Sequence, residues 1–177
     1  ALQLVEAHAG TLRFDTACDM ASHVDARVAI AFAFERGRVR FAGVGGERME
    51  AEGLARLFPL HDIAVMGLTE VVPQLPRIFR RLNQTVEAVR AQRPAVLVTI
   101  DAPTFCLRIA KRARAMGIPA IHYVAPQLWA WRPGRVRKLA GQIDRLMLLL
   151  PFEREFFDKA GIPNAYVGHP VLEDAQA

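Results

Sequence analysis

One stretch constrains the fold more than any other: a largely apolar run at residues 95–100 that ends at the carboxylate of Asp101. The run has the length of one strand and does not alternate with polar residues, which is typical of a parallel strand covered on both faces. Pro103 then opens a predicted helix over residues 104–116, and a second strand is predicted at residues 120–125. Because open α/β sheets bind ligands at the carboxyl ends of their strands, Asp101 lies at a candidate site.

The rest of the chain repeats this strand and helix pattern. Further strands are predicted at residues 27–34, 38–44 and 145–150. The tripeptide Gly-Ile-Pro occurs at residues 117–119 and again at 161–163, each time between a predicted helix and a predicted strand. We therefore predict a Rossmann-like α/β fold, with a parallel sheet and helices on both faces. The glycine-rich turn at residues 43–46 could bind phosphate, but its incomplete spacing favours a plain strand-to-helix turn.

Composition limits the class of partner. The 177 residues carry a formal net charge of +5, which favours an anionic partner such as nucleic acid, an acidic membrane surface or a phosphorylated ligand. The two cysteines form neither a disulfide framework nor a metal motif. No apolar run approaches the roughly 20 residues of a membrane span, and the first residues do not resemble a signal peptide.

An amphipathic segment precedes the central strand. From Leu75 onward its apolar residues recur with helical spacing, and several arginines flank the first turns. Pro73 and Pro76 predict that the chain before this helix is non-helical or in its first turn. The segment could lie on an anionic lipid surface, but the sequence alone favours an ordinary helix packed on the sheet.

The loop after the 120–125 strand holds both tryptophans, Trp129 and Trp131, followed by four basic residues between positions 132 and 138. Aromatic faces bury the C–H surface of sugars, and arginine forks bind phosphate, so the loop is a candidate sugar-phosphate site. The alternative is that both tryptophans fill the core and the charges are incidental. His122, inside the strand, fits a satisfied core histidine better than a catalyst.

Several motifs in one order carry a resemblance to a known family. They are Phe-Ala-Gly-Val-Gly-Gly-Glu-Arg-Met at 41–49, Ala-Val-Met-Gly at 64–67, Ile-Asp-Ala-Pro at 100–103, Ile-His-Tyr-Val-Ala-Pro at 121–126, Trp-Ala-Trp-Arg at 129–132, Leu-Pro-Phe-Glu at 150–153 and Val-Gly-His-Pro at 167–170. Over residues 38–174 the chain resembles the N-terminal half of the lipid-A-disaccharide synthase family. The resemblance implies a GT-B type glycosyltransferase with two Rossmann-like halves and the active site between them.

The resemblance also implies the reaction and its place. An inverting transfer moves 2,3-diacylglucosamine from UDP-2,3-diacylglucosamine to 2,3-diacylglucosamine 1-phosphate, in lipid A biosynthesis. The resemblance implies no metal and no cofactor, and no nucleic acid is expected as a partner. The enzyme is expected in the cytoplasm, peripheral on the anionic inner face of the bacterial inner membrane. The oligomeric state is left open.

The chemistry of individual residues and the family resemblance together indicate the candidate site residues. An inverting transfer needs a base for the attacking hydroxyl, and Asp101 is the first candidate, with His122 second. Since Asp101 comes just before Pro103, a helix-capping role is its alternative, or an additional role. Trp129, Trp131, Arg132 and Arg135 are the substrate-binding candidates, with the two arginines on the acceptor phosphate. Acylated substrates make the amphipathic segment a membrane-facing patch, formed by Leu68, Val71, Val72, Leu75, Ile78 and Phe79.

The chain departs from the family in three places. Residues 1–37 lack the family's Gly-Glu-x-Ser-Gly-Asp loop. We therefore interpret residues 1–37 as an atypical N-terminal segment that is frameshifted, chimeric or diverged. We expect residues 38–177 to form the acceptor-side domain, the C-terminal donor domain to be absent, and the chain to be a fragment that is inactive alone. Thr-Phe-Cys at 104–106 stands where the family more often has Asp-Phe-Asn.

Two other classes remain as alternatives at this point. A non-enzymatic basic domain could bind nucleic acid, but basic and aromatic residues do not alternate along a strand, and no helix-turn-helix or zinc spacing occurs. A different nucleotide-sugar enzyme, such as an epimerase, could use the same fold.

Overall fold

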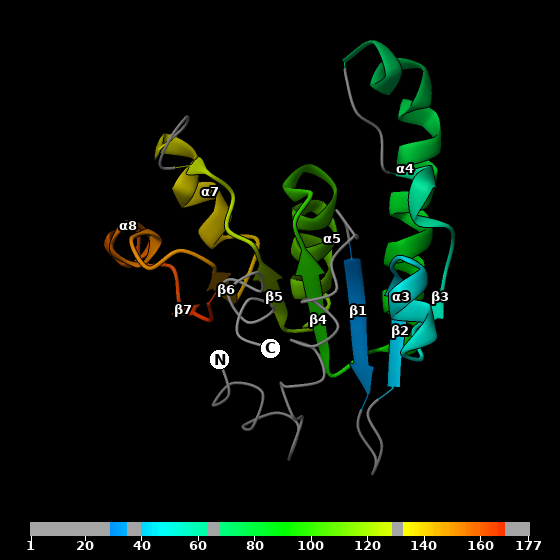
Figure 1. Ribbon diagram of the computed structural model, residues 1–177, viewed down its shortest axis with the longest axis horizontal. Helices are drawn as coiled ribbons and strands as arrows, with labels where there is room; N and C mark the ends of the chain where they lie inside the picture. Colours follow the sequence, from blue (N-terminus) through cyan, green and yellow to red (C-terminus); the bar gives the residue numbers. More distant parts are fainter. Residues whose placement is uncertain (1–28, 35–39, 64–67, 129–132, 169–177) are drawn as a thin grey trace.

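The chain folds around one seven-stranded sheet with the strand order β3-β2-β1-β4-β5-β6-β7 (Figure 1). The computed structural model describes residues 29–34, 40–63, 68–128 and 133–168. The strands are β1 (Ala29–Phe34), β2 (Arg40–Val44), β3 (Ala55–Arg56), β4 (Val96–Ile100), β5 (Ala120–Tyr123), β6 (Arg145–Leu148) and β7 (Asn164–Tyr166).

The predicted parallel sheet is confirmed for the strands after residue 38. β4 pairs in parallel with β5, β5 with β6 and β6 with β7, and β2 pairs in parallel with β3. β1 is antiparallel to both of its neighbours, β2 and β4. All other strands therefore run in one direction, and β1 is the exception within the described sheet. The carboxyl ends of β4 and β5 lie side by side, with Ile100 opposite Tyr123.

Helices cover both faces of the sheet, as predicted. They are α3 (Glu47–Ala51), α4 (Leu68–Gln92), α5 (Pro103–Ala115), α7 (Val136–Ala140) and α8 (Glu153–Lys159), with short 3-10 turns η1 (Leu60–Asp62) and η2 (Pro133–Arg135). The larger core cluster joins one face of the sheet to α4, α5, α7 and α8. Met49 of α3 packs on the other face with Ile121, Tyr123 and Met147.

The beginning of α4 differs from the prediction. The helix begins at Leu68, so Pro73 and Pro76 both lie inside it and not before it. Both prolines are exposed, so water can bond the backbone carbonyls that they leave without helical partners. Figure 1 shows that this first part of α4 extends beyond the carboxyl edge of the sheet.

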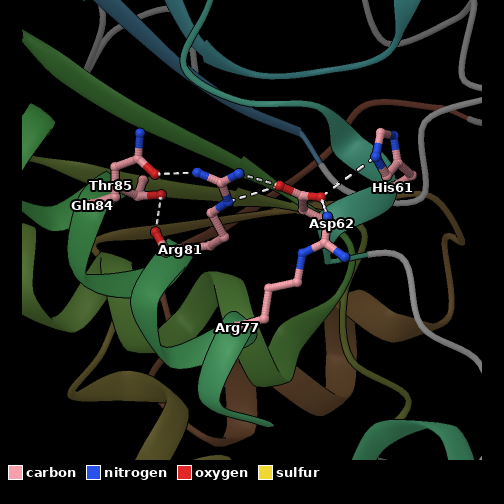
Figure 2. A network of polar contacts seen from close by, with 6 residues as sticks. All are labelled: His61, Asp62, Arg77, Arg81, Gln84 and Thr85. Atoms are coloured by element: carbon pink, nitrogen blue, oxygen red, sulfur yellow. Dashed lines mark hydrogen bonds and ion pairs between the residues drawn. The ribbon is translucent and has the colours of Figure 1, made fainter. Parts of the chain in front are cut away.

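A buried carboxylate attaches α4 to the preceding 3-10 turn (Figure 2). Asp62 is 1% exposed, and its Oδ2 accepts a hydrogen bond of 2.8 Å from Nε of Arg81. Arg77 forms a second ion pair with Asp62, through Oδ1. Arg81 also lies over the ring of Phe58, with Cζ 4.7 Å from the centroid. Two arginines one helical turn apart thus fix the rotation of α4 about its axis.

The glycine-rich turn before α3 has a packing explanation. A Cβ on Gly45 would lie 2.6 Å from Cδ2 of Leu54 and 2.7 Å from Sδ of Met49. Only glycine allows this close approach. No helix among the described residues is long and apolar enough to cross a membrane.

Candidate functional site

Strained backbone marks the carboxyl edge of the sheet where β4 and β5 end. Asp101 has φ 48°, Ala102 has φ 38° and Val124 has φ 71°. The left-handed region is unfavourable for residues with a Cβ, above all for β-branched ones such as Val124. Such residues cost about 1–3 kcal/mol each and cluster at functional sites. The two adjacent strand ends therefore have the backbone signature of a site.

Asp101 follows β4 directly, as the sequence predicted, but it does not cap the next helix. The N-cap of α5 is Ala102, and no side chain makes a capping hydrogen bond there. Ala102 instead accepts hydrogen bonds of 3.0 Å through its carbonyl from the N–H groups of Phe105 and Cys106. The capping interpretation of Asp101 is thus wrong, because the chain turns one residue later than a capping aspartate requires.

Backbone contacts hold Asp101 in place and leave its carboxylate available. Its N–H donates to the carbonyl of Tyr123 at 3.0 Å, which ties the end of β4 to β5. The residue is half-buried. Burial and then the negative charge of Asp101 raise the pKa of the Cys106 thiol, so this cysteine stays protonated. A carboxylate on a rigid, strained strand end is suited to accept a proton from a bound hydroxyl.

His122 occupies a different environment, inside the core. Its ring is buried, with Nδ1 2.8 Å from Oγ1 of Thr99, and the Thr99 hydroxyl donates to the carbonyl of Ile121 at 3.1 Å. Since the hydroxyl proton is used on Ile121, we assign the ring proton to Nδ1, which leaves Nε2 as an acceptor. Among the described residues Nε2 has no hydrogen-bond partner. Burial lowers the pKa of His122 to about 4, so the ring is neutral at pH 7.

A cavity of about 360 Å³ opens at the start of α5, where Pro103, two residues after Asp101, belongs to its lining. Its walls come from the start of α5, the segment after β5, and α7 with the turn before it. The basic residues in the walls are Arg108, Arg135 and Lys138. Of the predicted substrate-binding residues, Arg135 is therefore at the cavity, whereas Trp129, Trp131 and Arg132 lie outside the described residues.

The predicted membrane-facing patch is divided in the structure. Leu75 and Phe79 are 39% and 49% exposed. Ile78 is half-buried and packs against the main core cluster, so it belongs to the inner side of α4. The side chains of Leu68, Val71 and Val72 lie outside the described part of the chain.

Sequence reasoning included Lys138 among the basic residues of the candidate sugar-phosphate loop but missed Arg108. Arg108 lies on the polar face of the predicted helix at residues 104–116. A charged residue there is usually solvated, so its position does not indicate a functional site. In the structure Cζ of Arg108 lies 5.8 Å from the centroid of the Phe79 ring, and the residue also lines the cavity. The described residues contain no cluster of three or more histidine, cysteine, aspartate or glutamate side chains that could hold a metal.

Comparison with known proteins places the chain in a family. The family model described as lipid-A-disaccharide synthetase matches residues 18–177. A lipid-A-disaccharide synthase of Rhodospirillum centenum is 53% identical over 139 residues, which is 77% of this chain and 35% of that protein. The synthase of Granulibacter bethesdensis is 50% identical over 135 residues, covering 76% and 34% of the two chains. That of Myxococcus xanthus is 43% identical over 148 residues, covering 84% and 39%.

The chain belongs to the lipid-A-disaccharide synthetase family. It spans about a third of the length of the curated relatives named above.

Proposed function

We propose that the chain is the acceptor-side part of an inverting glycosyltransferase of lipid A biosynthesis. The donor is UDP-2,3-diacylglucosamine and the acceptor is 2,3-diacylglucosamine 1-phosphate. Family membership supports the reaction class, since the relatives are named lipid-A-disaccharide synthases. The single observation that supports this assignment of the site is the position of Asp101, a carboxylate without a capping role on a strained strand end.

In this proposal Asp101 is the general base. It takes the proton of the acceptor 6-hydroxyl while that oxygen attacks the anomeric carbon of the donor. The bond from the anomeric carbon to the UDP oxygen breaks as the new glycosidic bond forms, and UDP leaves with the bonding electron pair. Attack from the side opposite UDP inverts the anomeric centre. His122 is the poorer candidate, because its buried ring would have to be uncovered before it could reach a substrate.

The proposal includes attachment to the anionic inner face of the inner membrane. Leu75 and Phe79 expose apolar surface on α4, and exposed arginines lie on the same helix. An amphipathic helix with aromatic, aliphatic and basic side chains binds at the boundary between lipid headgroups and acyl chains. Acylated substrates would then reach the site without leaving the bilayer surface.

The test is substitution of the aspartate that matches Asp101 in a full-length relative. Asp101→Asn is expected to lower turnover by about two to four orders of magnitude, because general-base catalysis contributes that much. Acceptor binding should change little, since the lost interaction acts mainly in the transition state. Near-normal turnover of this variant would refute the assignment.

Asp144 provides a matched control at the opposite edge of the sheet. Its carboxylate accepts hydrogen bonds from Nε of Arg114 at 2.9 Å and from the N–H of Ala120 at 2.8 Å. The variant Asp144→Asn should lower the melting temperature and spare turnover. Asp101→Asn should show the reverse, because no capping hydrogen bond is lost.

A further inference from the structure

The cavity at the start of α5 has an unusual charge balance. Its lining includes three basic residues, Arg108, Arg135 and Lys138, together with the polar residues Thr104 and Gln142. None of the described lining residues is an aspartate or glutamate. Three cations around one concave surface repel one another, and walls of low dielectric constant strengthen the field inside the cavity. An anion in the cavity would remove this repulsion.

These cations differ from the seven arginines and lysines that form ion pairs in the described part of the chain. Arg81 is paired with Asp62, Arg114 with Asp144 and Lys159 with Glu155. Arg108, Arg135 and Lys138 are exposed, and no carboxylate among the described residues forms an ion pair with them. Their charges are therefore available to a ligand.

The size and the surroundings of the cavity identify the kind of anion. A volume of about 360 Å³ lies within the roughly 300–1,000 Å³ of small-molecule sites, and it suits a phosphorylated sugar better than a polymer. Pro103 and Thr104 belong to the lining, and Asp101 precedes Pro103 by two residues. A sugar held by its phosphate in the cavity would thus lie near the proposed base.

Arg108 connects the cavity with the apolar side of α4. Its guanidinium lies over the exposed ring of Phe79, while the residue also lines the cavity. A ligand with a phosphate in the cavity could therefore place acyl chains over Phe79 and Leu75. This arrangement suits an amphipathic ligand, in which a charged group and apolar chains are joined to one sugar.

We infer that the cavity binds the phosphate monoester of the acylated acceptor, with Arg108, Arg135 and Lys138 as its charged contacts. The inference rests on the proposed function for the identity of the acceptor. The guanidinium groups of Arg108 and Arg135 and the ammonium group of Lys138 can share the two negative charges of a phosphate monoester. Each guanidinium group can bind two phosphate oxygens at once. The Thr104 hydroxyl and the Gln142 amide supply neutral hydrogen-bond donors.

The test is an NMR titration of the ¹⁵N-labelled 177-residue chain with glucosamine 1-phosphate, which carries the monoester without acyl chains. Glucosamine and inorganic phosphate are titrated separately. Glucosamine 1-phosphate should shift the amide signals of Thr104 and Gln142 and should bind at least about fivefold more weakly to Arg108→Ala, Arg135→Ala and Lys138→Ala. Glucosamine without phosphate should not shift these signals.

Arg137→Ala is the matched control, because Arg137 lies on α7 next to Lys138, is exposed, and is not in the lining. It should bind glucosamine 1-phosphate like the unmodified chain. Equal weakening by Arg137→Ala would mean that net surface charge, and not the cavity, attracts the phosphate. Unchanged affinity in the three lining variants would also overturn the inference, as would equal affinity for inorganic phosphate, which would exclude a contribution from the sugar.

Two further measurements distinguish this inference from headgroup binding at a membrane and from the proposed function. Vesicles of phosphatidic acid and phosphatidylcholine present a phosphate monoester on a bilayer; if they bind through the lining residues while glucosamine 1-phosphate does not, the cavity recognises membrane headgroups and the inference fails. The proposed function fails separately, if the Asp101→Asn relative keeps its turnover. A cavity that binds glucosamine 1-phosphate would stand in that case.

Discussion

Removing the Asp62 carboxylate is expected to lower the free energy of unfolding by about 3 kcal/mol. The carboxylate is 1% exposed and is held by two arginines of α4 (Figure 2). The Arg81 side chain is only 21% exposed, so its charged hydrogen bond to Asp62 should contribute about 2 kcal/mol. The Arg77 side chain is 44% exposed, so its pair should add about 1 kcal/mol or less. Loss of a buried pair member can reach about 3–5 kcal/mol, but here the arginines can regain water.

Urea unfolding of Asp62→Asn, Arg81→Gln and Arg77→Gln measures these contributions. The order of destabilisation should be Asp62→Asn first, Arg81→Gln second and Arg77→Gln last. The effect of Asp62→Asn should persist at about 0.5 M salt, because buried pairs are screened little. Arg90→Gln is the exposed control; its pair with Glu87 lies on the surface of α4, and its loss should change stability by less than about 0.5 kcal/mol.

Two results would refute this reasoning. A loss below about 1 kcal/mol for Asp62→Asn would mean that the cost of desolvating the carboxylate already cancels both ion pairs. A larger effect for Arg77→Gln than for Arg81→Gln would mean that exposure does not rank the two pairs.

Three further outcomes are expected. Because His122 has its pKa lowered from 6.5 to about 4, unfolding takes up a proton below pH 6.5, and stability should fall by about 3 kcal/mol between pH 6.5 and 4. Urea midpoints at pH 7 and 4.5 should therefore differ less in His122→Gln than in the unmodified chain. Leu75→Glu with Phe79→Glu should reduce co-sedimentation with anionic vesicles and keep the melting temperature, whereas Ile78→Glu should lower the melting temperature because Ile78 packs on the core. Ala102→Gly should stabilise the chain by about 1 kcal/mol, because glycine removes the left-handed strain at φ 38°, and a loss of stability on urea unfolding would contradict this.

The fold could largely be predicted because local sequence patterns, such as apolar runs and helix-stopping glycines, indicate its strands and helices. The run at 95–100 and the helix stop at Gly117, with φ 77°, are both as expected. The beginning of α4 was not predictable from local rules, since Pro73 and Pro76 lower helix propensity and the compensating contacts to Asp62 come from outside the helix. The antiparallel direction of β1 could not be predicted either, because an apolar strand pattern at residues 29–34 is the same for parallel and antiparallel pairing.

The candidate site could be predicted only where one residue carried the signal. Asp101 stands out because a carboxylate ends an apolar run. The strain at Ala102 and Val124 has no sequence signature, since neither residue is a glycine or an asparagine, which favour such conformations. The cavity combines residues from 103 to 142, and the placement of Arg108 against Arg135 and Lys138 depends on how α5 and α7 pack.

Net charge is the property whose meaning changes most between sequence and structure. The formal charge of +5 suggested an anionic partner but gave it no location. Two of the ion pairs that neutralise basic side chains join residues far apart in the chain, 19 positions for Arg81 with Asp62 and 30 for Arg114 with Asp144. A count of charges cannot distinguish these arginines from Arg108 and Arg135, which have no ion-pair partner among the described residues. A ligand is attracted by the local field of unpaired cations, so the phosphate site proposed above rests on the position of the cavity and not on the total charge.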